Sequence, residues 1–411
     1  MTFSRSLKRS DLALPSAWLC VLVVGLFVQM SGLLFNSDGS RYATQAYLVL
    51  FVPALILLAW RRLDLHIWSQ APGLILVCLL AWVVLTGAFN TGSTHGLAYW
   101  LKIDALILLY VFTVASLTRH ERAFNFLLVA VVLVAAIFAW WTLVYQFGVL
   151  DKPLKYRAVR LSELGWGGLA DLDNPIVAGM YYGVFAVLLT YLFVGQKLRI
   201  WQMGVLVLAM LGLLAYVLFT FSRGAWLSTA AGGVLVLLLF PNIKSRTLIG
   251  IGCLLVVVSA PLFWPEFQHE QRIGVNGRHP IWANWAEQFA GFWLLGAGAG
   301  ADLFFQLPNS TTRYLHAHSL YLQLWYEYGI VGIGLFVLLL LSLLHKGWVC
   351  RAQPLARVGL ALLVFAMVAM VSDVYAIFHR LSPYWVLVWF PVGILLGVRP
   401  PATAKAAASQ Q

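Results

Sequence analysis

Two histidines separated by a single residue are the first candidates for chemistry in this chain. His316 and His318 stand in the segment H-A-H-S-L-Y-L-Q, directly before a long apolar run. An imidazole ring can take up or release a proton near neutral pH, as a general base must. Zinc would need a further ligand, and the sequence contains neither H-E-x-x-H nor H-x-x-x-H. The pair therefore indicates proton transfer, and we predict no metal site.

An arginine between two apolar runs is the second candidate. Arg223 lies in the segment F-S-R-G-A-W. An arginine near a membrane interface is costly unless its side chain snorkels to water or pairs with an anion. The planar guanidinium group can hold two phosphate oxygens at once, which favours an anion ligand just under the surface. A snorkelling anchor is the alternative interpretation.

Further basic residues gather between the apolar runs. Lys155, Arg157 and Arg160 lie in D-K-P-L-K-Y-R-A-V-R, and Arg313 precedes the histidine pair. Such side chains can contact an anionic lipid headgroup, such as that of a phosphorylated glycolipid, or can belong to a solvated loop. We expect these four residues to bind substrate.

The composition tells what kind of protein positions these residues. The chain has 411 residues, of which 62% are hydrophobic and 10% are charged, against about 45–50% and about 25% in a soluble domain. A soluble globule cannot bury so much apolar surface, so a soluble enzyme and a DNA-binding protein are excluded. The net charge of +12 is scattered over short loops, and we expect no nucleic-acid partner.

Apolar runs long enough to cross a bilayer as helices recur along the whole chain. Since backbone groups in lipid need internal partners, each run is expected to be helical. We predict an all-α polytopic membrane protein, with residues 1–411 forming a single integral membrane domain. The twelve predicted transmembrane helices lie near residues 13–35, 42–60, 72–90, 97–116, 124–147, 175–194, 201–221, 225–240, 247–263, 319–344, 356–375 and 384–398.

The lysines and arginines between these spans indicate the orientation. With the N-terminus in the cytoplasm, the larger share of the 27 lies on the cytoplasmic side, as the positive-inside rule requires. An even number of spans leaves the C-terminus cytoplasmic too, and we expect residues 400–411 to be a disordered tail. Two long segments then lie outside, a basic loop at 151–174 and a large loop at 264–318.

The large outer loop contains two further patterns. Trp282, Trp285, Phe289 and Phe292 recur at helical spacing, which predicts helices at the membrane interface. The segment L-G-A-G-A-G-A-D at 295–302 has the look of a nucleotide-binding loop, but it follows no strand and is expected outside the cell. We interpret it as a tight passage of the backbone.

These motifs together resemble those of the O-antigen ligase and polymerase superfamily. The matching motifs are S-R-G at 222–224, G-R…W at 277–282, the G-A-G-A-G stretch, and H-x-H-S-L-Y-L-Q…E-x-G-I-x-G from His316. One departure is Ser319, because such proteins often have Asn after the second histidine. The resemblance implies an inverting, metal-independent glycosyltransferase with a GT-C-like architecture. It also implies an active site at the periplasmic face of the inner membrane of a Gram-negative bacterium.

The same resemblance implies the substrates and the roles. The donor would be O-antigen polysaccharide on undecaprenyl diphosphate, and the acceptor lipid A–core, so that no ATP or other cofactor is needed. Arg223 and Arg278 would stabilise the negative charge that grows on the diphosphate. His318 would be the first choice for the base that activates the acceptor hydroxyl, with His316 second. A polysaccharide polymerase using the same donor and a lipid-linked glycan transporter remain alternatives.

Overall fold

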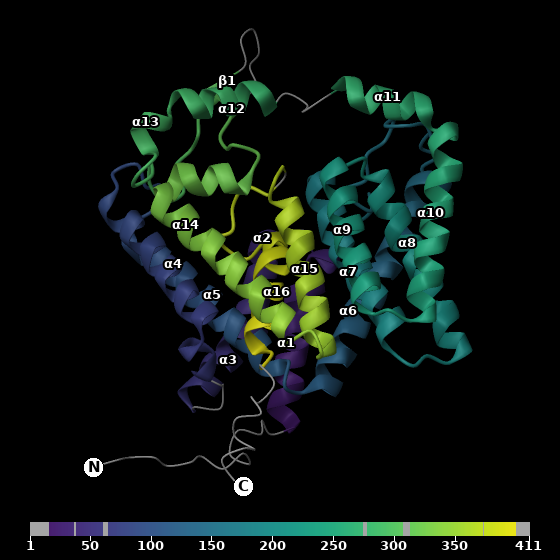
Figure 1. Ribbon diagram of the computed structural model, residues 1–411, viewed down its shortest axis with the longest axis horizontal. Coiled ribbons are helices and arrows are strands. Elements are labelled where there is room, and N and C mark those ends of the chain that lie inside the picture. Colours follow the sequence, from purple (N-terminus) through teal and green to yellow (C-terminus); the bar gives the residue numbers. More distant parts are fainter. Residues whose placement is uncertain are drawn as a thin grey trace.

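The computed structural model describes residues 16–36, 38–60, 65–273, 278–306, 313–372 and 374–399. The predicted cytoplasmic tail at 400–411 lies outside the described residues. Almost every described element is a helix, and the helices run side by side as a bundle (Figure 1).

Nine helices in the described part of the chain are long and apolar enough to cross a membrane. They are α1 (Ser16–Phe35), α2, η1 and α3 as one run (Gly39–Ala46, Tyr47–Phe51 and Val52–Ala59), α4 (Ala71–Phe89), α5 (Leu97–Leu117), α6 with η3 (Glu121–Leu143 and Val144–Val149), α7 (Pro175–Gly195), α8 (Ile200–Phe219), α10 (Ile243–Leu262) and α14 (Leu320–Val349).

Three shorter apolar helices complete the bundle, namely α9 (Arg223–Leu239), α15 (Pro354–Ala369) and η4 with α16 (Trp385–Trp389 and Phe390–Gly397). Nine long and three short helices make twelve, and each overlaps one predicted span. The all-α polytopic membrane fold is therefore confirmed. A short helical turn, η2 (Leu65–Ser69), precedes α4.

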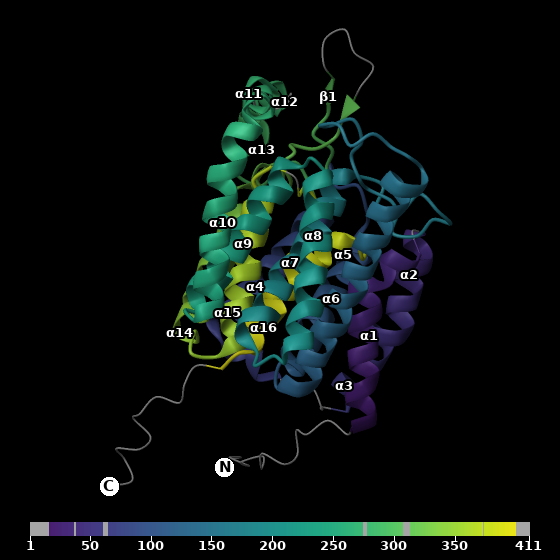
Figure 2. The same cartoon turned by 90° about the vertical axis from the view of Figure 1, so that its right-hand side faces the viewer.

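The remaining elements lie together at one end of the bundle, which we call the site face (Figures 1 and 2). These elements are α11 (Trp264–Ile273), α12 (Arg278–Glu287), α13 (Phe289–Phe292) and the strand pair β1 (Phe305–Gln306) and β2 (Arg313–Tyr314). They belong to the predicted large outer loop. Helix α1 begins, and α16 ends, at the opposite face (Figure 2).

Helix α7 is the centre of one half of the bundle and packs against α8, α9 and α15. Close packing there depends on small residues, as is common between membrane helices. A Cβ at Gly232 of α9 would lie 2.9 Å from the side chain of Val187 and 3.1 Å from that of Phe365. This packing holds the first turn of α9, where Arg223 stands, against the core of the bundle.

Helix α14 is bent at Gly329, whose φ of 64° is not helical (Figure 1). The bend frees backbone carbonyls, which must find other donors in an apolar setting. The backbone N–H groups of Ala297 and Gly298 donate to the carbonyls of Tyr326 and Glu327 over 2.7 and 3.2 Å. The glycine-rich stretch is therefore the predicted tight passage, and it packs directly on the bend.

The aromatic side chains at 282, 285, 289 and 292 of α12 and α13 are buried or partly buried within the protein. Trp285 and Phe292 are buried in a small second core with Tyr326 of α14. The indole N–H of Trp285 donates to the carbonyl of Leu322 over 3.0 Å, and that of Trp282 to the carbonyl of Ala317 over 2.9 Å. The spacing that predicted interfacial helices thus serves to hold the outer loop to the start of α14.

Candidate active site

Arg223 is the first residue of α9, and the chain before it is shaped to start that helix. Ser222 is the N-cap, and its hydroxyl accepts a hydrogen bond from the N–H of Ala225 over 3.3 Å. Phe221, just before the cap, has a φ of 47°. The N-terminus of a helix carries partial positive charge and free N–H groups, so anions are stabilised there. The S-R-G motif therefore places a guanidinium group at an end of a helix that already favours an anion.

The basic loop brings two more arginines to the same place. The Nε of Arg160 donates to the carbonyl of Thr220 over 3.0 Å, and the N–H of Leu161 donates to the carbonyl of Phe219 over 3.0 Å. These bonds attach the loop to the end of α8. Arg157, Arg160, Arg223 and Arg278 line one small cavity of about 40 Å³, which we call the arginine pocket.

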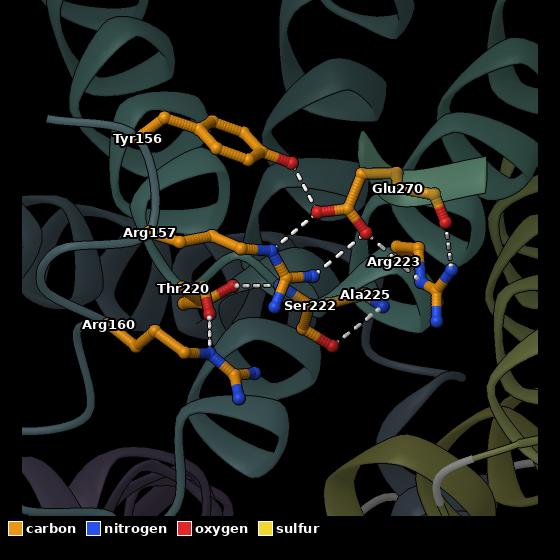
Figure 3. Close-up of polar contacts among 8 residues, drawn as sticks. All are labelled: Tyr156, Arg157, Arg160, Thr220, Ser222, Arg223, Ala225 and Glu270. Carbon is orange, nitrogen blue, oxygen red and sulfur yellow. Dashed lines mark hydrogen bonds and ion pairs between the residues drawn. The ribbon is translucent and has the colours of Figure 1, made fainter. Parts of the chain in front are cut away.

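A carboxylate from α11 lies among these arginines (Figure 3). Glu270 accepts hydrogen bonds from both Nε and NH2 of Arg157, the second over 2.9 Å, and from the hydroxyl of Tyr156. Its Oε2 lies 3.5 Å from the Nε of Arg223, whose NH1 also donates to the Glu270 carbonyl over 3.2 Å. Burial alone would raise the pKa of the Glu270 carboxyl, but these hydrogen bonds and charges outweigh burial and lower that pKa.

An apolar groove of about 650 Å³ runs from the arginine pocket down between α9, α14 and α15. Arg223 and Arg278 line both cavities. Below them the groove is lined mainly by apolar side chains, among them Leu227, Leu344 and Met367. A charged pocket opening onto an apolar groove fits an amphiphile with an anionic head.

The two histidines line a third cavity of about 390 Å³, which we call the histidine cavity. It is adjacent to the arginine pocket, because Ile176 at the start of α7 lines both. The ring of His316 lies between those of His318 and Tyr375, with centroids 4.2 and 4.1 Å away. Burial, and to a smaller extent the neighbouring His318, lower the pKa of His316 to about 4. His316 is therefore neutral at physiological pH.

His318 lies just outside helix α14. Helix α14 begins at Leu320 with Ser319 as its N-cap, and His318 lies before the cap with a φ of 51°. A positive φ is uncommon for residues other than glycine, and such strain concentrates at functional sites. The ring of His316 packs against two other rings and the backbone of His318 is strained, so the fold holds both histidines in place.

Backbone strain marks the same region independently. The described residues other than glycine with positive φ are Asp151, Arg157, Ala170, Asp173, Phe221 and His318. Arg157 and Phe221 line the arginine pocket, while Asp173 and His318 line the histidine cavity. Strain that the surrounding fold maintains at two adjacent cavities supports a shared function for them.

The predicted site residues therefore divide into two groups. Arg157, Arg160, Arg223 and Arg278 meet in the arginine pocket, and both histidines meet in the adjoining cavity. Lys155 and Arg313 are exposed and line neither cavity. Arg313 instead lies in the β1–β2 pair, with its guanidinium 5.9 Å from the centre of the Phe304 ring.

Sequence patterns did not reveal Glu270, Tyr156, Tyr375 or Arg380 as part of this region. The acid and the tyrosines stand in no recognisable motif, and only folding brings α11 and the segment at 374–384 to the arginines and histidines. Within the described ranges, no three His, Cys, Asp or Glu side chains are grouped as metal ligands. Metal independence stays a prediction.

Fold and site together define a polytopic helical membrane protein with an anion pocket and a pair of histidines at one face. Residues 208–337 match the family model described as O-antigen ligase. The chain is also similar to an O-antigen ligase of Pseudomonas aeruginosa, with 24% identity over 393 residues that cover 95% of this chain and 92% of that protein. The predicted resemblance to this family is therefore confirmed, and the matched region contains Arg223, Arg278 and both histidines.

Proposed function

We propose that this protein is an O-antigen ligase of the bacterial inner membrane, acting at the periplasmic face. It would transfer polysaccharide from undecaprenyl diphosphate to lipid A–core during lipopolysaccharide biosynthesis. The observation that carries this proposal is that Arg223 and Arg278 line both the arginine pocket and the apolar groove. A polyprenyl diphosphate is the kind of ligand that needs both at once.

The donor would lie with its chain in the groove and its diphosphate at the junction. Guanidinium groups suit the diphosphate because they are always charged and hold two oxygens each. The α9 N-terminus adds donors aimed at the same place. The glycan would then extend from the arginine pocket past Ile176 into the histidine cavity.

The arginine pocket must change before the diphosphate enters. Its volume of about 40 Å³ is near that of a single water molecule. Glu270 occupies the guanidinium groups that the phosphates would use. We infer that the donor displaces this carboxylate, so that Glu270 holds Arg157 and Arg223 in place until the diphosphate replaces it.

The transfer breaks one bond and forms one. The acceptor hydroxyl oxygen attacks the anomeric carbon of the donor sugar, and the bond from that carbon to the phosphate oxygen breaks. The electron pair leaves with undecaprenyl diphosphate, whose growing charge the arginines stabilise. Attack from the face opposite the leaving group inverts the anomeric centre. The hydroxyl proton passes to an imidazole and then to solvent.

His318 is our candidate for that imidazole. A base works best when its pKa lies near the operating pH, and a pKa of about 4 makes His316 a weak proton acceptor. Two imidazolium rings with centroids 4.2 Å apart would also repel each other. We assign His316 to positioning, since its neutral ring packs against both His318 and Tyr375.

The alternatives differ in what they make. A polymerase would use a second lipid-linked glycan as acceptor, and a transporter would make no new bond. The test is transfer by the purified protein from undecaprenyl-diphosphate-linked glycan to lipid A–core. A lipid A–core product carrying the polymer supports the ligase, and elongated lipid-linked glycan would identify a polymerase. A protein that moves the donor without joining it to anything would be a transporter.

A further inference from the structure

A fourth cavity adjoins the histidine cavity and shares no described lining residue with the arginine pocket. It has a volume of about 390 Å³ and shares His316, Tyr375 and His379 with the histidine cavity. The two carboxyl side chains in its lining are those of Asp302 and Glu327. We call it the acid cavity. The cavities thus form a row, from the apolar groove through arginines and histidines to acids.

The lining of the acid cavity does not suit a phosphate. Unlike the arginine pocket, it has no lysine or arginine among its described lining residues; Arg380 lines the neighbouring histidine cavity. Burial lowers the pKa of His379, which therefore favours its neutral form. An anion entering this cavity would meet carboxyl side chains and aromatic rings, with no lysine or arginine in the described lining, so it would lose its hydration without contacting a cationic side chain there.

The lining does suit a sugar. Flat rings from His95, Tyr99 and Trp100 stand on one side, with His95 and Tyr99 stacked at 4.0 Å between centroids. Polar groups able to bind hydroxyls, including the carboxylate of Asp302, stand at the same cavity. Ligand sites commonly combine apolar and aromatic walls with a few polar groups that fix orientation. A volume of about 390 Å³ lies in the usual range for small-ligand sites.

The walls of this cavity are built before any ligand arrives. The carboxylate of Glu327 accepts hydrogen bonds from Gln323 Nε2 over 2.8 Å and from the N–H of Gly300 over 2.9 Å. The N–H of Thr94 donates to the carbonyl of Ala299 over 3.1 Å, and Trp100 donates to the carbonyl of His95 over 3.0 Å. The glycine-rich passage therefore joins the bend of α14 to the segment between α4 and α5.

We propose that the acid cavity binds the terminal sugar of the acceptor, and that it selects a sugar that is uncharged or carries an amine. This inference rests on the proposed function. An inverting transfer needs the acceptor hydroxyl on the side opposite the diphosphate, and the histidine cavity adjoins both the arginine pocket and the acid cavity, which share no described lining residue. The two charge environments keep the substrates apart, because the diphosphate is repelled where the acceptor binds.

Two variants test this with the full-length protein in lipid nanodiscs. Asp302→Asn keeps the shape of the side chain and removes its charge, and Ala376→Leu fills part of the cavity. Asp302→Asn should raise the KM for lipid A–core by about ten- to hundredfold, the range for a lost hydrogen bond to a charged group. Ala376→Leu should raise the same KM by excluding the sugar. The KM for the lipid-linked donor should change less than about twofold.

Glu163→Gln is the matched control, because Glu163 is an exposed acid that lines none of the four cavities. It should leave both KM values unchanged. A second comparison uses core oligosaccharides that end in a hexose or in the same hexose carrying a phosphate. The wild type should prefer the unmodified end by at least about tenfold, and Asp302→Asn should narrow that preference.

The outcomes separate this inference from the proposed function. Wild type that makes no transfer product overturns the proposed function. Wild type that is active, with both variants keeping a normal acceptor KM, overturns the acceptor site alone. A parallel rise of both KM values would also overturn it, because the cavity would then support the fold and not the acceptor. If the wild type used the phosphorylated and the unmodified core oligosaccharides equally well, the proposed charge selectivity would be overturned.

Discussion

The arginine pocket and the acid cavity stand at opposite ends of the histidine pair and differ in both charge and space. The first has four guanidinium groups around about 40 Å³, already neutralised in part by Glu270. The second has two carboxyl side chains around about 390 Å³. Like charges that converge on an empty site repel, so the arginines need an internal anion until a ligand comes. The acid cavity has separated acidic side chains and aromatic walls, so it needs no internal counterion and can stay open.

This difference suggests how one active site handles two unlike substrates. On the proposed function, the donor end would exchange one anion for another and would have to rearrange, whereas the acceptor end would be preformed. The predictions that follow test the histidines between the two ends first, then the arginines, and then the weaker influences.

His318→Ala should have the largest effect, lowering kcat by about 10²–10⁴-fold, the usual contribution of a general base. Donor binding should change little, because the arginines hold the diphosphate. The measurement is the rate of transfer from lipid-linked glycan to lipid A–core, with exposed His279→Ala in α12 as control. If His316→Ala were inactive and His318→Ala normal, the roles of the two rings would be exchanged.

Arg223→Lys should lower kcat by about 10²-fold or more, within the range for losing one donor to developing negative charge. Lysine keeps the charge but cannot form the two-pronged contact. Arg278→Ala should lower kcat similarly. If both arginines hold one diphosphate, the double variant should raise the activation free energy by less than the sum of the two single increases. Arg199→Lys, an exposed change outside the site cavities, is the control. Equal rates for Arg223→Lys and wild type would remove Arg223 from the mechanism.

The dependence on pH separates the two histidines. With a pKa of about 4, His316 gains its proton only well below neutrality, so it cannot cause a loss of activity between pH 7 and pH 5. Since we assign the base to His318, a loss of activity in that range should persist in His316→Gln. The check is a kcat–pH profile for both proteins, in which an acid limb that disappears with His316→Gln would contradict our assignment.

Glu270→Gln should have a small effect in the favourable direction. Removing the carboxylate charge takes away the competitor for Arg157 and Arg223, so the KM for the donor should fall by about two- to fivefold, as partly exposed ion pairs are worth little. Glu287→Gln, an exposed acid on α12, serves as control. A higher donor KM for Glu270→Gln would instead show that the carboxylate aligns the arginines for the diphosphate.

Excess EDTA should have no effect on turnover, because arginines rather than a metal ion are assigned to the diphosphate. The measurement is transfer by the purified protein before and after chelation. If activity were lost and only magnesium or manganese restored it, that role would belong to a metal ion. The acidic side chains of the site face would then be the candidate metal ligands.

Much of the fold followed from local sequence. Each membrane helix satisfies its own backbone groups and has only to be apolar over its length, so twelve spans were visible without knowledge of their neighbours. The glycines at 296, 298 and 300 also foretold a tight passage, because their φ values of 85°, 128° and 69° suit residues without a Cβ.

What the passage packs against was not visible in the sequence. The glycine-rich stretch packs against the bend at Gly329, some thirty residues later in the chain. Similarly, helix α14 begins at Leu320 with Ser319 as its N-cap, which a pattern of apolar residues cannot resolve to a single position.

The sequence by itself determined the membrane class, the positions of the apolar helices and the residue types able to hold a phosphate or accept a proton. These are properties of single residues and of short runs. Only the tertiary structure decided that Arg157 and Arg160 join Arg223 while Lys155 and Arg313 do not, and that Glu270 stands among them. It alone set the row of cavities from basic to acidic. The physical reason is that each membrane helix depends mainly on its own residues, which must be apolar enough for lipid. A site between helices depends instead on long-range contacts that bring distant residues together.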